Sequence, residues 1–364
     1  MAGAAGLMMP SLALIVLFLV SAARGAPIRS DEEVLFLPSM GYRSADGMWK
    51  LEVNAWAFER ERRRASLAVF RKALGLDADE MSQAEREMFT QRARPFLQDN
   101  HRGKQITILL GGQRHELGRT GANGRLADHL ALAEREVQAL RAASDKPGSV
   151  IRFSASLPAA DLRTLVGEVH LLEAEGLSVI SDIDDTIKVS HVSNRKALLR
   201  STFIKPFEPV PGMAQVYQQW AAKAGAQFHY VSASPWQLYE PLAGFIRTNG
   251  YPAGTFHLKD FRWKDQSFFN LFGSPEDYKA GVIGPLLERF PQRRFVLVGD
   301  SGEKDPEIYA RLARAHPAQV ARIFIREVAG GDTNQARYQA AFAGLPPGMW
   351  TVFRTPAEIE GINP

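Results

Sequence analysis

The chain contains no cysteine. Disulfides, zinc sites built on thiolates and catalytic thiolates all need cysteine, so this absence excludes them together. An excess of one charge is missing too, because 44 Lys and Arg residues stand against 40 Asp and Glu, which gives a formal net charge of +4. A surplus this small gives no ground for nucleic-acid binding, and it favours anionic ligands such as phosphates only weakly.

Several signatures of other hydrolases and of nucleotide-binding proteins are also missing. The sequence has no His-Glu-x-x-His, no phosphate-binding loop of the Walker type and no Arg-His-Gly. His115 and Glu116 lack a second histidine at the spacing that a zinc site on a helix requires. These absences exclude the corresponding metalloprotease, nucleotide-hydrolase and histidine-phosphatase chemistries.

An apolar run at residues 12–20 is followed by small residues at 21–25. The run is shorter than the ~20 residues that a membrane-spanning helix needs. The pattern indicates a signal peptide over residues 1–25, cleaved after Ala23 or Gly25, although no Lys or Arg precedes the run. We therefore expect an exported, periplasmic protein, and the alternative is an uncleaved membrane anchor.

Residues 27–175 have a β-rich pattern. Apolar and polar residues alternate over 49–56, and two apolar segments at 106–110 and 113–117 flank Gly111-Gly112, as in a hairpin. Helical spacing is confined to residues 64–76 and 82–98. We predict a sandwich-like accessory domain with a helical insertion, and the pattern indicates no function for it.

From residue 177 the pattern changes to alternating strands and helices. Strands are predicted at 177–182, 228–232, 255–259, 294–299 and 320–326, and helices at 213–224, 238–249, 275–289 and 305–315. This alternation is typical of an α/β domain in which helices cover both faces of a parallel sheet. Ligands then bind at the carboxyl ends of the strands.

Polar motifs lie at those predicted strand ends. They are Asp182-Ile183-Asp184-Asp185-Thr186, the strand-ending Ser232, the helix-borne Lys279, and Gly299-Asp300 followed by Asp305. Carboxylates crowded together raise each other's pKa unless a cation neutralises them, and Mg²⁺ prefers such oxygen ligands. A phosphate would then bind to the metal, the lysine and the serine, with one carboxylate attacking phosphorus and Asp184 transferring protons.

Two of these assignments have competitors. Lys259, also at a strand end, is the alternative to Lys279, and Ser234 is the alternative to Ser232. We favour Lys279 on its spacing to Asp300, and we interpret Ser234 as a residue that leads into the next helix before Pro235. Asp185 is interpreted as a solvated residue or one with a local hydrogen bond.

The four motifs together resemble those of the haloacid dehalogenase-like (HAD) phosphatase superfamily. The context is similar to one branch, the fungal actin-patch type of phosphatidate phosphatase and its bacterial relatives. The segments that carry this resemblance are 177–188, 210–213, 231–236, 299–309 and 348–353. It implies a HAD-like Rossmannoid catalytic domain over residues 176–357, with Mg²⁺ as cofactor.

The resemblance also implies a role for each motif residue. Asp182 would be the nucleophile and a metal ligand, and Asp184 the acid/base with its backbone carbonyl on the metal. Thr186 would brace the loop, and Ser232 and Lys279 would bind the phosphoryl group. Asp300 would complete the metal site, with Asp305 supporting it or orienting Lys279.

The spacing of the motifs also limits the size of any cap over the site. Residues 187–231 are only 45 in number, so the resemblance implies a minimal cap and a site open to a bulky substrate. Aromatic and basic residues mix over 261–272, which suits either transient contact with a membrane surface or a loop packed under the sheet. The basic residues Arg195, Lys196, Arg200 and Lys205 suit either an anionic substrate or a solvated helix face.

We therefore predict an exported, Mg²⁺-dependent phosphomonoesterase that forms an aspartyl-phosphate and acts on phosphatidate or a related lipid phosphate. One alternative is a phosphatase for soluble phosphomonoesters or phosphoproteins. The other is a binding module without catalysis, against which the intact acidic motifs argue. No nucleic-acid partner is expected.

Overall fold

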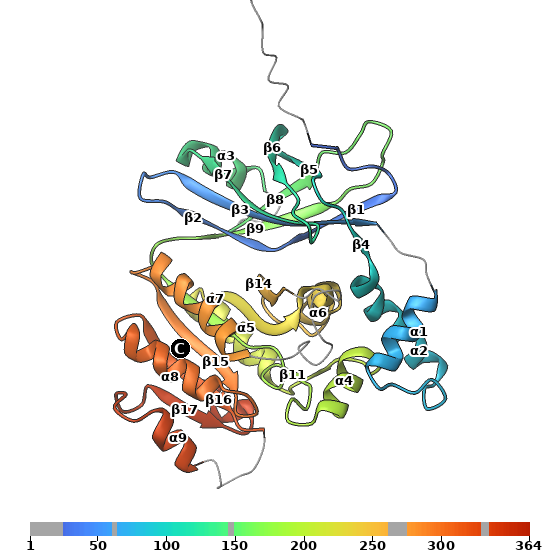
Figure 1. Cartoon of the computed structure of the whole chain (residues 1–364). Coiled ribbons are helices and arrows are strands. Elements are labelled where there is room, and N and C mark those ends of the chain that lie inside the picture. The colour runs from blue at the N-terminus through green and yellow to red at the C-terminus, as the bar shows by residue number, and fades with distance from the viewer. Residues whose placement is uncertain (1–24, 60–63, 145–148, 261–274, 329–334) are drawn as a thin grey trace, which may run out of the picture.

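The computed structural model describes residues 25–59, 64–144, 149–260, 275–328 and 335–364. The predicted signal peptide, apart from Gly25, and the aromatic run at 261–272 lie outside these ranges. Two large sheets dominate the described part of the chain, a β-rich one from its N-terminal half and an α/β one from its C-terminal half (Figure 1).

The N-terminal sheet is built around the long strand β3 (Trp49–Glu59). One edge of β3 pairs with β1 and β2, and the other edge pairs with β7 and β4. The partners are β1 (Glu32–Leu37), β2 (Ser39–Arg43), β4 (Asp99–Asn100), β5 (Gln105–Leu110), β6 (Gln113–Arg119), β7 (Arg125–Leu132), β8 (Val150–Ala155) and β9 (Val166–Leu172). Buried and partly buried residues alternate along most of β3, because successive side chains point to opposite faces of a strand.

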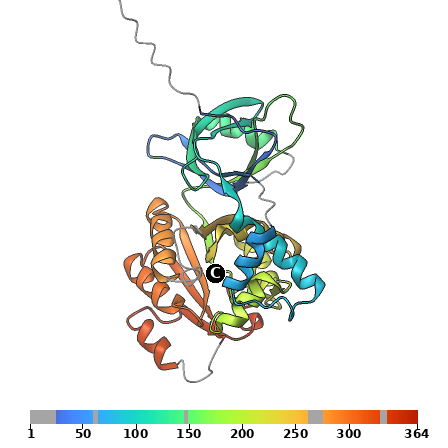
Figure 2. The same ribbon diagram turned by 45° about the vertical axis from the view of Figure 1, so that its right-hand side comes forward.

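These strands form one sheet that curls around its own apolar core, as Figure 2 shows, and not the predicted sandwich of two sheets. The reason lies in β3, whose 11 residues are long enough to pair with two successive strands on each edge. The predicted hairpin is confirmed: β5 and β6 pair across Gly111 and Gly112, whose φ angles of 57° and 78° suit glycine.

The helical insertion consists of α1 (Arg64–Ala73) and α2 (Gln83–Ala93), followed by the 3₁₀ turn η1 (Arg94–Leu97). Helix α2 begins at a capping box, in which Ser82 and Glu85 each bind the other's backbone N–H. Both helices lie where helical spacing was predicted. Helix α3 (Glu134–Ala142) and the strands β1 and β2 were not predicted.

The C-terminal sheet is parallel throughout, which confirms the α/β prediction. Its strands follow the order β14-β13-β10-β15-β16-β17. They are β10 (Leu177–Ser181), β13 (Gln227–Pro235), β14 (Gly254–Lys259), β15 (Arg294–Asp300), β16 (Val320–Arg326) and β17 (Trp350–Phe353). The direction of strand addition reverses at β10, and such a reversal opens a crevice at the carboxyl end of the strand.

Helices cover both faces of this sheet. On one face α5 (Met213–Ala224) and α6 (Tyr239–Thr248) pack on a core that includes Val179, and on the other α7 (Pro275–Arg289) and α8 (Asp305–Ala315) pack on a core that includes Ile180. A small hairpin of β11 (Lys188–Val189) and β12 (Glu208–Pro209) carries α4 (Arg195–Phe203) between its strands. Helix α9 (Gln335–Ala341) precedes β17.

The two halves share a continuous apolar core. Trp56 of β3 packs edge-on against Trp236, which follows β13, with ring centroids 4.0 Å apart. Phe70 of α1 contacts Phe203 of α4 in the same way at 5.8 Å. The change from one sheet to the other falls between Leu172 and Leu177, and the domain boundary predicted there stays a prediction.

None of the helices within the described ranges combines the length and apolar content that a bilayer crossing requires.

Candidate active site

The first motif begins where β10 ends. Asp182 is only 1% exposed, and its backbone N–H donates to the carbonyl oxygen of Val298 on β15 at 2.9 Å. Ile183 and Ile187 are fully buried, so the loop is anchored to the core between its polar residues. Thr186 Oγ1 donates to Asp182 Oδ2 at 3.0 Å. This hydrogen bond joins the two ends of the motif, and the supporting role predicted for Thr186 stays a prediction.

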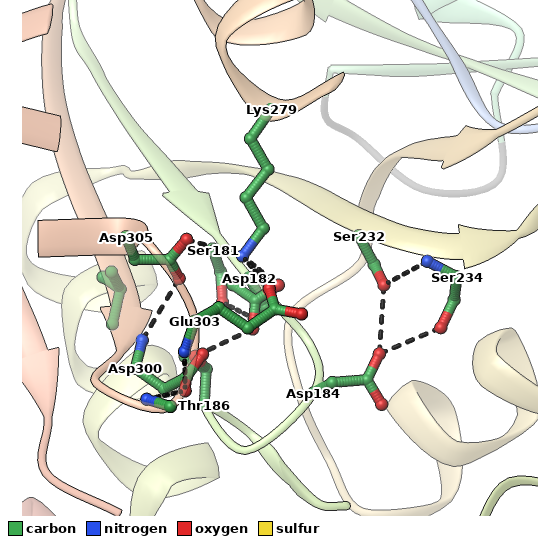
Figure 3. Close-up of polar contacts among 12 residues, drawn as sticks. Ser181, Asp182, Asp184, Thr186, Ser232, Ser234, Lys279, Asp300, Glu303 and Asp305 are labelled. Atoms are coloured by element: carbon green, nitrogen blue, oxygen red, sulfur yellow. Dashed lines mark hydrogen bonds and ion pairs between the residues drawn. The ribbon is translucent and has the colours of Figure 1, made fainter. Parts of the chain in front are cut away.

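A buried lysine faces Asp182 (Figure 3). Lys279 Nζ lies 2.9 Å from Asp182 Oδ1 and donates to Glu303 Oε2 at 2.9 Å and to Asp305 Oδ1 at 2.6 Å. Burial opposes its charge, but these three carboxylates outweigh burial and raise the pKa of Lys279 well above its usual value. The structure thus places Lys279 against Asp182, whereas Lys259 ends β14, two strands away from β10.

Three carboxylates form a cluster that could hold a metal ion. Oxygens of Asp182, Asp300 and Asp305 lie within 4.8 Å of one another. Asp300 Oδ2 is buried and accepts no hydrogen bond within the described part of the chain, and the buried Asp182 Oδ1 faces Lys279. Burial, together with the neighbouring carboxylates, raises the pKa of Asp182 and of Asp300 well above the usual range. A hard divalent cation such as Mg²⁺ fits this donor set, because it would satisfy the unpaired Oδ2 of Asp300 and neutralise the cluster.

The side chain of Asp184 points away from this cluster, toward the serines of β13 (Figure 3). Lys188 Nζ lies 2.7 Å from its Oδ1, and the hydroxyls of Ser190, Ser232 and Ser234 donate to it at 2.7, 3.1 and 2.9 Å. Burial alone would raise its pKa, but Lys188 and these hydrogen bonds lower the pKa of Asp184 to about 2. Asp184 is therefore ionised in this structure.

Three of the residues that contact Asp184 were not expected to do so from the sequence. Ser234 lies within β13 and binds Asp184, so its role is not limited to leading into the next helix. Lys188 and Ser190 were not predicted as site residues. The only clue to them in the sequence was that they lie in the segment directly after Thr186. This segment folds back toward Asp184 because β11 pairs with β12.

Asp185 shapes the loop, in line with the local hydrogen bonding expected for it. Its φ angle of 55° is left-handed, and its carboxylate accepts the backbone N–H groups of Ser190, His191 and Val192 at 2.7, 3.0 and 2.6 Å. The carbonyl oxygen of Asp185 accepts from Arg326 of β16 at 2.6 Å. Asp185 thus fixes the path of the segment that carries Lys188 and Ser190.

A cavity of about 230 Å³ opens at this end of β10 and β13. It is lined by Asp182, Asp184, Val192, Arg195, Leu198, Ser232, Ala233, Ser234 and Glu303. Arg195 therefore lies at the site, whereas Lys205 and Arg200 face away and pair with Glu85 of α2 at 2.8 and 3.5 Å. Of these basic residues, Arg195 is therefore placed to contact an anionic substrate, whereas Arg200 and Lys205 are not.

The fold and this geometry define a class of protein. An acidic pair on the strand where the sheet order reverses, a buried lysine and a carboxylate cluster suited to a cation are the parts of a phosphate-hydrolysing α/β domain. In agreement, residues 177–327 match the family model described as the catalytic domain of phosphatidate phosphatase APP1. The resemblance inferred from the motifs is confirmed for this segment, which is similar to that catalytic domain.

Two relatives from yeasts show the same similarity. Phosphatidate phosphatase APP1 of Saccharomyces cerevisiae is 36% identical over 154 residues, which are 42% of this chain and 26% of the relative. An uncharacterised protein of Schizosaccharomyces pombe is 30% identical over 171 residues, 46% of this chain and 28% of the relative. The chain thus spans about a quarter of the length of these relatives.

Proposed function

We propose that the chain is an exported, Mg²⁺-dependent phosphatase with a HAD-like catalytic domain, which hydrolyses phosphatidate or a related lipid phosphate. The observation that carries the proposal is the meeting of Asp182, Asp300 and Asp305, with the unpaired buried Oδ2 of Asp300, beside Lys279. The similarity of residues 177–327 to a phosphatidate phosphatase catalytic domain supports the substrate class. The pattern at residues 1–25 supports export, and the aromatic run at 261–272 supports transient contact with a membrane surface.

The proposed reaction has two steps. Asp182 attacks phosphorus and forms an acyl phosphate while the bond from phosphorus to the ester oxygen breaks, and the leaving oxygen takes a proton from Asp184. A water molecule then gives a proton to Asp184 and attacks the acyl phosphate, which releases inorganic phosphate and restores Asp182. Lys279 and Ser232 hold the phosphoryl oxygens in both steps.

Two conditions follow from the geometry. A cation held by Asp182, Asp300, Asp305 and the backbone carbonyl of Asp184 would neutralise the charge on the phosphoryl oxygens. Asp184 must also gain a proton, although its pKa is about 2 in the ligand-free site. A phosphate dianion bound beside Asp184 adds a like charge, which raises that pKa and favours the protonated form.

The experiment is a measurement of phosphate release from phosphatidate in mixed micelles, from soluble monoesters and from a phosphopeptide, each with Mg²⁺ and with a chelator. We expect Mg²⁺-dependent release that is fastest with phosphatidate. Asp182→Asn should lower kcat about 1,000-fold or more, because it removes the nucleophile. Asp46→Asn, which changes an exposed carboxylate in the turn before β3, serves as the matched control.

A different experimental result would contradict each part of the proposal. Unchanged phosphate release by Asp182→Asn would contradict the aspartyl-phosphate, and full activity in chelator would contradict the metal. Faster release from soluble monoesters or the phosphopeptide would move the substrate class to those compounds. Recovery of the full chain with residues 1–25 intact from the cytoplasm would contradict export.

A further inference from the structure

The catalytic cavity has an uneven distribution of charge. Asp182, Asp184 and Glu303 place three carboxyl groups on its wall. Of the described residues that line it, Arg195 is the one basic side chain, while Lys279 is fully buried and pairs with Asp182. Buried lysines already pair with these carboxylates, so Arg195 is the cation of the lining that an approaching phosphate dianion can meet.

Helix α4 holds Arg195 in that place. The side chain of Asn194 caps the helix by accepting the backbone N–H of Ala197 at 3.1 Å. Leu199 and Phe203 pack into the apolar core, and Leu198, one turn after Arg195, is buried beside it in the cavity lining. Arg195 occupies the first position of this anchored helix, so its backbone is fixed while its exposed side chain can reach a ligand.

The size of the cavity limits what can enter. A volume of about 230 Å³ is below the roughly 300–1,000 Å³ of pockets that enclose a whole drug-sized ligand. A phosphoryl group and the atoms next to it can therefore enter, while the rest of a large substrate stays outside the rim. Of the lining residues, Arg195 is exposed and Val192 is partly buried, so both can contact a substrate that extends out of the cavity.

We propose that Arg195 is a specificity-determining residue, which binds the phosphoryl group of a phosphomonoester from the rim and selects for a dianion. The guanidinium presents parallel N–H donors that match two phosphoryl oxygens, and this geometry favours a monoester over a diester with one charge less. Val192 and Leu198 provide the apolar wall for the first carbon atoms of the leaving group. This inference rests on the proposed function and adds a residue that the four motifs do not contain.

The neighbouring residue Lys196 offers a matched control. It is exposed on the same first turn of α4 and carries the same charge, but it does not line the cavity. Long-range attraction of anions would be weakened equally by the loss of either residue. Direct binding of the phosphoryl group would be weakened only by the loss of Arg195.

The test compares Arg195→Ala, Arg195→Lys and Lys196→Ala in the full chain with Mg²⁺. We expect Arg195→Ala to raise KM for a phosphomonoester about tenfold or more and to weaken the binding of inorganic phosphate, measured by calorimetry, by a similar factor. Arg195→Lys should fall between Ala and wild type, because it keeps the charge but loses the paired donors. Lys196→Ala should stay within about twofold of wild type in both measurements.

Either of two results would overturn the inference: equal effects of Arg195→Ala and Lys196→Ala, or unchanged KM and phosphate affinity in Arg195→Ala. Both can be told apart from failure of the proposed function, in which the wild type itself would release no phosphate. In that case the calorimetric comparison of wild type with Arg195→Ala still decides whether Arg195 binds phosphate.

Discussion

At the scale of single residues, the acidic motif shows how environment separates neighbouring carboxylates. Asp182 faces Lys279 and two other aspartates, Asp184 is held by Lys188 and three hydroxyls, and Asp185 accepts three backbone N–H groups. The three side chains are equally acidic in water. In the proposed reaction Asp182 is the nucleophile and a metal ligand and Asp184 transfers protons, whereas the contacts of Asp185 hold the loop.

Asp185 gives a prediction about stability. Asp185→Ala removes a buried acceptor for three N–H groups and places alanine at a φ angle of 55°. We expect the free energy of unfolding to fall by about 2–4 kcal/mol, of which about 1 kcal/mol comes from the left-handed backbone. Urea denaturation measures this loss.

Two further variants divide the loss between its causes. Asp185→Gly should recover about 1 kcal/mol of it, because glycine relieves the backbone strain but not the missing acceptor. Asp185→Asn should be the mildest of the three, since asparagine tolerates this backbone and keeps one acceptor oxygen. An alanine variant as stable as the wild type would refute the role given to Asp185.

At the scale of elements, α4 of the C-terminal half packs against the helical insertion of the N-terminal half. Phe203 at its end packs among aromatic rings of the inserted helical segment, namely Phe70, Phe89 and Phe96. Arg92 of α2 donates to the carbonyl oxygens of Thr202 and Lys205 at 2.9 and 2.6 Å. The inserted helices therefore hold the end of α4 that lies away from the cavity.

Arg92 gives a second prediction. Arg92→Met keeps much of the side-chain volume but leaves the last carbonyl groups of α4 without this donor, and it removes the cation that lies 3.8 Å from the ring centre of Phe207. We expect the free energy of unfolding to fall by about 2–3 kcal/mol. Thermal and urea unfolding measure the effect.

Arg86→Met is the matched control, because Arg86 lies on the same helix and the hydrogen bond from its side chain to the carbonyl oxygen of Ala78 is exposed. Its loss should change stability by less than about 0.5 kcal/mol. Equal losses in the two arginine variants would show that Arg92 does not support α4 specifically.

The elements also show how far sequence can predict this fold. Residues 213–224, 275–289, 305–315 and 320–326 were assigned with the boundaries that the structure has, since long periodic segments bounded by Gly and Pro give clear signals. Strand β2 was missed because its five residues, Ser39 to Arg43, include a glycine and little alternation. The single curled sheet was missed because strand pairing depends on contacts far apart in the chain.

The site, like the fold, could be predicted only in part from the sequence. Its residues at strand ends could be placed together because the ends of parallel strands meet. The contact of Lys188 with Asp184 depends on the β11–β12 hairpin, and the place of Arg195 on the rim depends on the packing of α4. Neither depends on a motif, so neither could be derived from spacing.

At the scale of the whole molecule, the two sheets meet beside a buried polar network. The backbone N–H of Phe256 on β14 donates to the carbonyl oxygen of Pro38, next to β2, at 3.3 Å. Nearby, His229 of β13 is 1% exposed and lies between the hydroxyls of Ser178 and Thr255, at 3.0 and 2.8 Å. This network joins the three strands β10, β13 and β14 at residues near their amino ends, away from the cavity.

The network makes stability depend on pH. Burial, assisted by the nearby His257, Arg293 and His170, lowers the pKa of His229 well below its usual 6.5, and burial lowers that of His257 to about 4. Both are therefore neutral in the native state at pH values where the unfolded chain binds protons. Stability is then fully present above pH 6.5 and falls as the pH drops from 6.5 toward 4, by about 1.4 kcal/mol per pH unit for each histidine.

His229→Gln tests this dependence, because it removes one proton-binding group from the unfolded state while glutamine can still bond to a neighbouring hydroxyl. Its free energy of unfolding should be lower than that of the wild type at pH 7.5, but its decline from pH 6.5 to 5 should be less steep by about 1.4 kcal/mol per unit. Urea denaturation at a series of pH values gives both quantities. His129→Gln removes an exposed histidine from β7 and should keep the slope of the wild type. If the slope of His229→Gln equals that of His129→Gln, protons taken up by other groups unfold the molecule in acid, and His229 has no part in its pH dependence.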